Sequence, residues 1–133
     1  MIVLDTHALV WLAEGSARLG KKSLSHIDKA LQAEKLFVSV ISFWEVAMLI
    51  EKRRLEMQMS VNLWRKNLID NGLKEVDLTG DMAVYSASLS NFHGDPADRM
   101  IVATANSLTA TLCTADEKIL GCDLGLMRLD ARK

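Results

Sequence analysis

Short runs of apolar residues alternate along the chain with stretches in which apolar residues recur every three or four positions. The short runs are typical of buried strands in a parallel sheet, and the longer spacing is typical of helices that cover such a sheet. Strands are therefore expected at Ile2–Leu4, Leu36–Ile41, Leu73–Leu78, Thr109–Cys113 and Leu126–Leu129. The alternation of strands and helices predicts an α/β fold, a three-layer α/β/α domain with a mainly parallel sheet.

Polar residues indicate where several of the intervening helices begin. Thr6 is expected to cap a helix that runs toward Gly15, and Ser42 is expected to open a helix that ends near Lys52. The other helices are expected around 24–31, over 60–71, from Thr79 to about Asn91, over 97–105 with Pro96 at the first position, and over 115–120.

The length and composition predict one folded domain that spans residues 1–133. Half of the 133 residues are hydrophobic and a quarter are charged, as in ordinary globular proteins. No repeat or low-complexity linker divides the chain. The net charge is −1, from 16 basic and 17 acidic residues, so any attraction to a nucleic-acid phosphate has to be local.

The cysteines and the hydropathy indicate the expected compartment. Cys113 and Cys122 lack the spacing of a zinc site or a disulfide framework, which favours a reducing environment. No stretch approaches the roughly 20 apolar residues that cross a bilayer. Asp5 interrupts the first apolar run, so a signal peptide is not expected either. The expected location is the cytoplasm, with no membrane partner.

Four acidic residues stand where a predicted strand ends or a predicted helix begins: Asp5, Glu45, Asp98 and Asp116. The carboxyl ends of parallel strands meet at one edge of the sheet, so we expect these carboxylates to lie close together. Converging anions repel one another unless a divalent cation neutralises them, and Mg²⁺, with Mn²⁺ as a substitute, prefers oxygen ligands. Because such an ion can polarise a phosphodiester and lower the pKa of a bound water, the pattern predicts phosphoryl-transfer chemistry.

Each of these carboxylates also has a structural explanation. Glu45 would close a capping box with Ser42, and Asp95 would cap the helix that follows it. Asp98 falls in the first turn of that helix, where the helix dipole favours an anion, and Asp116 would have the same role after Thr114. Asp5 differs, because a carboxylate buried without a partner at the end of an apolar strand costs several kcal/mol, on the order of 2–7.

The segments around the four carboxylates resemble the PIN-domain nucleases, specifically the VapC toxins of bacterial toxin–antitoxin pairs. The matching segments are DTHALVWL, SFWEVAML, DPADRMIVATA and TADEKI, which together span nearly the whole chain. The resemblance implies a PIN-like α/β/α fold, Mg²⁺-dependent endoribonuclease activity, homodimerisation and neutralisation by a small cognate antitoxin. It also implies that Asp5, Glu45 and Asp98 are the core metal-binding catalytic carboxylates, and that Asp116 is a more variable fourth.

Other residues in these segments keep two readings each. Asp95 matches an acidic position of this toxin subgroup, as an N-cap or as support for the ligands. Thr6 and Thr114 are candidates to hydrogen-bond a ligating carboxylate or a metal-bound water. His7 would contact RNA or pack at the helix terminus. Arg99 would contact phosphate or orient a neighbouring carboxylate.

Two other classes of function fit parts of the pattern. Phosphatases and phospho-receivers also place an Asp at a strand end beside Mg²⁺, but the phosphatase pattern has a second Asp two residues after the first, where this chain has His7. A non-catalytic protein- or RNA-binding module would use the carboxylates as helix caps, and Trp11, Trp44 and Trp64 as an apolar surface. Metal-dependent cleavage of RNA discriminates between these readings.

Overall fold

The structure is a computed structural model that describes residues 1–90, 92 and 94–133. In this part of the chain one five-stranded sheet has the order β3-β2-β1-β4-β5, and all four pairings are parallel. The strands are β1 (Ile2–Leu4), β2 (Leu36–Ser39), β3 (Lys74–Val76), β4 (Thr111–Thr114) and β5 (Arg128–Asp130). The predicted α/β class is therefore confirmed, with a fully parallel sheet.

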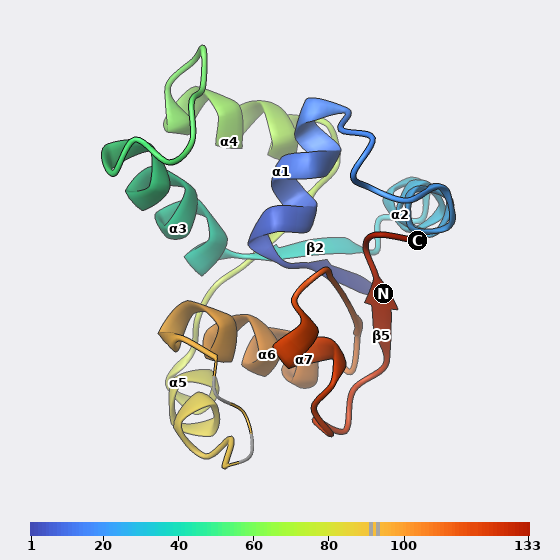
Figure 1. Cartoon of the computed structure of the whole chain (residues 1–133), viewed down its shortest axis with the longest axis vertical. Coiled ribbons are helices and arrows are strands. Elements are labelled where there is room, and N and C mark those ends of the chain that lie inside the picture. Colours follow the sequence, from blue (N-terminus) through green and yellow to red (C-terminus); the bar gives the residue numbers. More distant parts are fainter. Residues whose placement is uncertain (91, 93) are drawn as a thin grey trace.

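Helices connect the strands and cover both faces of the sheet. They are α1 (Thr6–Glu14), α2 (Lys21–Gln32), α3 (Val40–Glu51), α4 (Val61–Asp70), α5 (Gly80–Ala87), α6 (Pro96–Leu108) and α7 (Glu117–Leu120). Figure 1 shows α1, α3 and α4 above the strands and α5, α6 and α7 below them. This arrangement is the predicted three-layer α/β/α architecture.

The strands bury side chains on both faces, which explains their continuous apolar sequences. Leu4 and Val38 belong to the apolar cluster shared with α1 and α2, whereas Val3 and Leu112 belong to the cluster shared with α6. Successive residues of a strand point to opposite faces, so each short strand contributes to both clusters. The sheet is thereby packed against helices on both faces.

The predicted boundary between the second strand and the next helix is wrong. The strand β2 ends at Ser39, whose Oγ accepts a hydrogen bond from the backbone N of Ile41 at 3.2 Å and so caps α3. The helix begins at Val40, and Ser42 lies inside its first turn instead of opening it. Apolar, β-branched Val40 and Ile41 fit a strand as well as a buried helical turn, so periodicity alone misplaced the boundary.

The cap of α1 also differs from the prediction. Asp5 is the N-cap, and its Oδ1 accepts a hydrogen bond from the backbone N of Ala8 at 2.8 Å. Thr6 is the first helical residue, so its hydroxyl is available for contacts outside the helix. A carboxylate and a hydroxyl are both good N-caps, and the sequence does not distinguish two adjacent candidates.

Smaller differences affect other element ends. Thr109 ends α6 in a left-handed conformation with φ of 50°, so β4 begins two residues later than predicted. The predicted cap Thr79 is confirmed for α5, but Asn91, where the end of that helix was expected, lies outside the described residues. No helix within the described residues is long and apolar enough to cross a membrane.

Candidate metal centre

A cleft of about 440 Å³ lies at the carboxyl edge of the sheet. The central strand β1 has β2 on one side and β4 on the other, so the chain crosses to opposite sides of the sheet at this point. Such a switch point leaves a crevice in open α/β sheets. All four predicted carboxylates and one further acid line the cleft: Asp5, Glu45, Asp95, Asp98 and Asp116.

Asp5 is held at the bottom of this site by two hydrogen bonds. Asp5 is only 5% exposed. One of its carboxylate oxygens accepts a hydrogen bond from the backbone N of Ala8, and the other accepts one from the hydroxyl of Thr114. Burial raises the pKa of Asp5, and the bonds from Thr114 and Ala8 oppose that rise. The expectation of an unpartnered carboxylate is therefore corrected, although burial outweighs the two hydrogen bonds in its effect on the pKa of Asp5.

Glu45 reaches the cleft from the second turn of α3. Thr6 Oγ1 donates to Glu45 Oε1 at 2.5 Å, and a second hydrogen bond joins Thr6 Oγ1 to Ser42 Oγ at 3.0 Å. A hydroxyl has one hydrogen, so we infer that Ser42 donates to Thr6 while Thr6 donates to Glu45. The predicted capping box between Ser42 and Glu45 is wrong, because helix α3 begins earlier and places Glu45 beyond its first turn.

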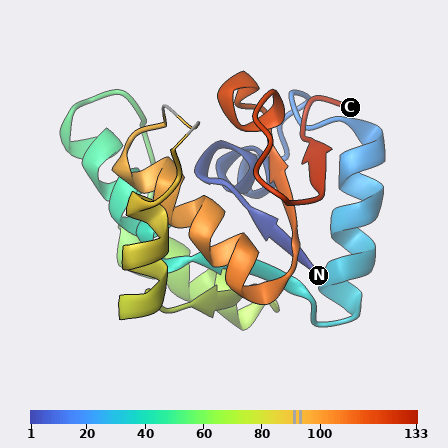
Figure 2. The ribbon, with the colours of Figure 1, turned by 90° about the horizontal axis from the view of Figure 1, so that it is seen from below.

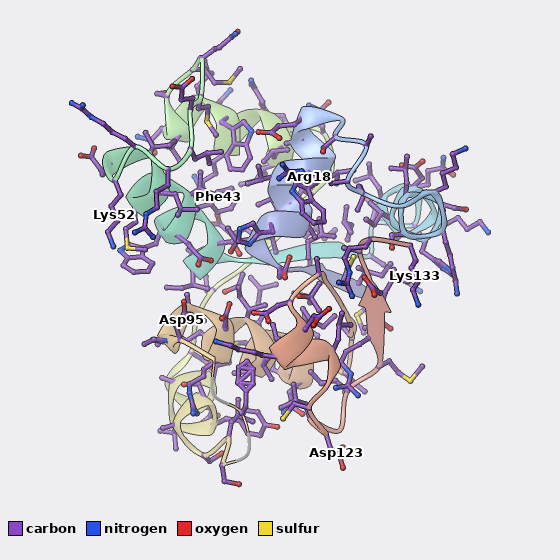
Figure 3. All side chains as sticks on the ribbon, in the orientation of Figure 1. Arg18, Phe43, Lys52, Asp95, Asp123 and Lys133 are labelled. Carbon is purple, nitrogen blue, oxygen red and sulfur yellow. The ribbon has the colours of Figure 1, made fainter. Side chains whose placement is uncertain are left out.

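The first turn of α6 supplies two carboxylates at once. Asp95 is the N-cap, as predicted, and its Oδ1 accepts from the backbone N of Asp98 at 2.9 Å; Figure 3 shows Asp95 at the start of this helix. Ligand oxygens of Asp95, Asp98 and Glu45 lie within 4.8 Å of one another, a spacing that one cation can bridge. The sequence pattern predicted only a capping or supporting role for Asp95. Its position three residues before Asp98 was the signal that both carboxylates lie at the same helix start.

The electrostatics of Asp98 reflect this crowding of anions. Burial, which is the largest cause, and the charges of the neighbouring acids together raise the pKa of Asp98 to about 7; these acids are Asp95, Asp116, Glu45 and Asp5. A carboxyl group whose ionisation is opposed by four neighbouring acids is typical of a site that a cation completes.

Asp116 stands on the other side of the cleft, beyond β4. It caps α7, with Oδ1 accepting from the backbone N of Lys118 at 2.8 Å, and its own backbone N donates to Thr114 Oγ1 at 3.0 Å. Thr114 thus connects Asp116 to Asp5, and Thr6 supports Glu45, as the sequence analysis expected of these two threonines. Asp5 and Asp116 line the cleft but lie outside the close trio of Glu45, Asp95 and Asp98.

Arg99 contacts the backbone and not a neighbouring carboxylate among the described residues, so its orienting reading is not supported, and its phosphate reading remains a prediction. Its guanidinium donates to four backbone carbonyl oxygens, at 2.6 to 3.3 Å, which belong to Ser86, Leu89, Phe92 and Gly94. Arg99 therefore ties the end of α5 to the first turn of α6, the turn that carries Asp95 and Asp98. Its partners lie on the preceding segment, which the proximity of Arg99 to Asp98 in the sequence does not reveal.

His7 is exposed and lines the cleft, and both of its readings remain predictions.

Arg99→Gln is expected to lower the free energy of unfolding by about 2 kcal/mol, because several carbonyl groups lose a charged donor. Arg99→Lys is expected to recover part of that loss, since an ammonium keeps the charge but lacks the planar fork. Urea unfolding measures both. Arg65→Gln is the control, because it removes a partly buried ion pair with Glu75 by the same chemical change. An Arg99→Gln variant as stable as Arg65→Gln would contradict this structural role.

Comparison with known proteins identifies the family. The sequence model of the PIN domain matches residues 2–121. The chain belongs to the PIN-domain family. It is 33% identical over 119 residues to Ribonuclease VapC22 of Mycobacterium tuberculosis, an alignment that covers 89% of this chain and 88% of that protein. The resemblance inferred from the sequence is thus confirmed.

Solved structures show the same fold at lower sequence identity. VapBC2 from Rickettsia felis bound to a DNA fragment from their promoter matches with a TM-score of 0.71 and 17% identity, over 97% of this chain and 98% of that chain. DNA-bound VapBC from Salmonella typhimurium matches with a TM-score of 0.68 and 16% identity, over 96% of each chain. The PIN-domain assignment replaces the phosphatase and phospho-receiver alternatives.

Proposed function

We propose that this PIN-domain protein is an endoribonuclease that depends on Mg²⁺, with Mn²⁺ as a substitute, and acts as the toxin of a toxin–antitoxin pair. The observation that carries the proposal is the convergence of Glu45, Asp95 and Asp98 within 4.8 Å in a cleft that Asp5 also lines. The 33% identical relative is named a ribonuclease, which supports RNA as the substrate.

The donor set of the cleft fits a hard divalent cation. The close trio offers carboxylate oxygens, which Mg²⁺ and Mn²⁺ prefer. Cys113, in contrast, lies in the apolar core, where burial raises the pKa of its thiol to about 12. In this proposal Asp5, Glu45, Asp98 and Asp116 are the catalytic and metal-binding residues, and we add Asp95 to them because its carboxylate lies within 4.8 Å of those of Glu45 and Asp98.

The protein's own side chains would act by position and charge. When bound, Mg²⁺ supplies the charge that makes water more acidic and stabilises the negative charge that develops on the phosphodiester. Thr6 holds the Glu45 carboxylate and Thr114 holds the Asp5 carboxylate, so both oxygens keep their places before any ligand arrives. Such preorganisation lowers the cost of assembling the charged site.

The partners proposed for the chain are RNA, a small cognate antitoxin and a second copy of the chain. Solved neighbours of the same fold include VapBC2 of Rickettsia felis and VapBC of Salmonella typhimurium, whose names describe complexes. The rival reading, a non-catalytic binding module, loses support because Trp11 and Trp64 pack against the core and only Trp44, 55% exposed, stands free of it. The three tryptophans do not form one exposed surface.

Cleavage of single-stranded RNA is expected in Mg²⁺ or Mn²⁺ and not in excess EDTA, because the carboxylate cluster repels phosphate unless a cation is present. The purified protein, freed of any bound inhibitor, is incubated with RNA in each condition, and the product ends are analysed. Attack by water predicts 5′-phosphate ends. Asp98→Asn protein from the same purification controls for contaminating nucleases. Cleavage undiminished in EDTA, or ends with a cyclic phosphate, would contradict the proposal.

A further inference from the structure

The acidic cleft poses an electrostatic problem for an RNA substrate. Five carboxylates line it, and a phosphodiester is itself an anion. Among the described residues that line the cleft, Arg132 is the one arginine or lysine. It comes from the segment that follows β5, beyond the 2–121 range that matches the PIN-domain model.

The guanidinium of Arg132 is oriented by two carboxylates. Its Nε and Nη2 donate to the two oxygens of Asp130 at 2.9 Å each, and its Nη1 donates to Glu117 Oε1 at 3.1 Å. A guanidinium has five N–H groups, and these three bonds leave two without a partner in the part of the chain that the structure describes. The two remaining N–H donors therefore belong to a guanidinium whose orientation is already fixed by Asp130 and Glu117.

The main chain around Arg132 is held as firmly as its side chain. The backbone N of Ala131 donates to the carbonyl of Thr114 at 2.9 Å, and the carbonyl of Lys133 accepts from the backbone N of Lys22 at 2.9 Å. The chain also passes so close to Gly20 that a Cβ there would lie 2.0 Å from the carbonyl carbon of Lys133. Figures 2 and 3 show this end of the chain beside α2.

Stability alone does not set this arrangement apart from the ion pair between Arg65 and Glu75. Ion pairs between exposed groups contribute little, and the Arg132 side chain is 46% exposed. Arg65 makes a comparable bidentate pair with Glu75 at 2.6 and 2.7 Å and is 41% exposed, but it does not line the cleft. What distinguishes Arg132 is its position at the acidic cleft with donors to spare.

We propose that Arg132 binds a phosphate group of the RNA backbone and positions the substrate at the carboxylate cluster. The proposal rests on the proposed ribonuclease function and adds a positioning residue to it. Arg recognises phosphate through paired N–H donors in a planar fork, which an ammonium does not reproduce. Because phosphate contacts carry no base information, Arg132 is expected to act on all RNA sequences alike.

The test compares Arg132→Gln, Arg132→Lys and the matched control Arg65→Gln. A fluorescein-labelled pool of short single-stranded RNAs of randomised sequence is the probe. Binding is measured with each substitution placed in an Asp98→Asn background with Mg²⁺, at several salt concentrations, with the intact probe verified on a gel. Cleavage by the single variants gives kcat and KM, and melting temperatures report on the fold.

Arg132→Gln is expected to weaken binding and to lower kcat/KM about ten-fold, mainly through KM, as the loss of one charged hydrogen-bonding contact does. The slope of log affinity against log salt should become shallower by about 0.7, the value for one phosphate contact on a single strand. Arg132→Lys should recover the salt slope and only part of the affinity. Arg65→Gln should behave like wild type, with a melting temperature similar to that of Arg132→Gln.

Binding and cleavage by Arg132→Gln that match those of Arg65→Gln would overturn the role of Arg132. The role would also be overturned if Arg132→Gln lowered both the melting temperature and the affinity but left the salt slope unchanged. An ion pair that only stabilises the fold predicts that result. Failure of the proposed function has a different signature. Wild-type protein that binds the probe but does not cleave it in Mg²⁺ or Mn²⁺ would reject hydrolysis while the salt slope still tests Arg132.

Discussion

Asp98→Asn is expected to reduce Mg²⁺-dependent RNA cleavage by at least about a hundred-fold, because it removes a charge from the proposed ligand set. Asn is nearly isosteric, and the backbone N of residue 98 keeps its bond to Asp95 Oδ1. The helix start is therefore preserved while the charge is lost. Cleavage rates at saturating Mg²⁺ measure the effect, and Asp28→Asn, an exposed change on α2, is the matched control.

The same variant is expected to melt at a higher temperature than wild type when EDTA removes divalent ions. Burial and the surrounding acids raise the pKa of Asp98 from 3.8 to about 7 in the folded protein. A raised carboxyl pKa means that the contribution of Asp98 to wild-type stability is most favourable below pH 3.8 and is lost as the pH rises to about 7. Asn does not ionise, so its advantage should grow across that window and stay constant above it.

Melting curves at several pH values, with and without Mg²⁺, test this linkage. Added Mg²⁺ should stabilise wild type more than Asp98→Asn, because the cation relieves the repulsion that the substitution has already removed. Cleavage at the wild-type rate by Asp98→Asn would reject the assignment of Asp98. A melting advantage that does not depend on pH would reject the electrostatic explanation of its raised pKa.

Glu45→Gln is expected to weaken Mg²⁺ activation and to lower cleavage by about ten- to a hundred-fold, with the melting temperature unchanged or raised. The amide oxygen of Gln can still accept the hydrogen bond from Thr6, so the substitution removes charge and little else. Cleavage is measured across a Mg²⁺ titration. A shifted midpoint would indicate weaker binding of the cation.

Glu51→Gln is the matched control for Glu45→Gln, because it makes the same chemical change at an exposed position on the same helix. Since the capping box is absent, helix capping no longer offers a structural role for Glu45. Identical Mg²⁺ titrations for Glu45→Gln and wild type would leave Glu45 as a partner of Thr6 alone. The metal site would then rest on Asp95, Asp98 and Asp5.

The sequence by itself determined the architecture and two of the acidic positions. Strands buried on both faces are continuous apolar runs, and helices between them have a different period, so the order of elements predicted the parallel α/β fold. Asp5 directly follows β1 and Asp98 lies in the first turn of α6, as expected, because strand ends and helix caps are local features. Pro96 marked the start of α6 for the same reason.

The tertiary structure alone decided which groups meet. Glu45 hydrogen-bonds to Thr6, 39 residues away, and not to Ser42 as a local capping motif suggested. Asp95 lies within the close trio, and Arg99 donates hydrogen bonds to backbone carbonyls of the segment that follows α5. Arg132 lines the cleft from the end of the described chain. Periodicity and caps depend on residues within a turn or two, whereas these contacts depend on how distant elements pack against the sheet, a relation that no local pattern encodes.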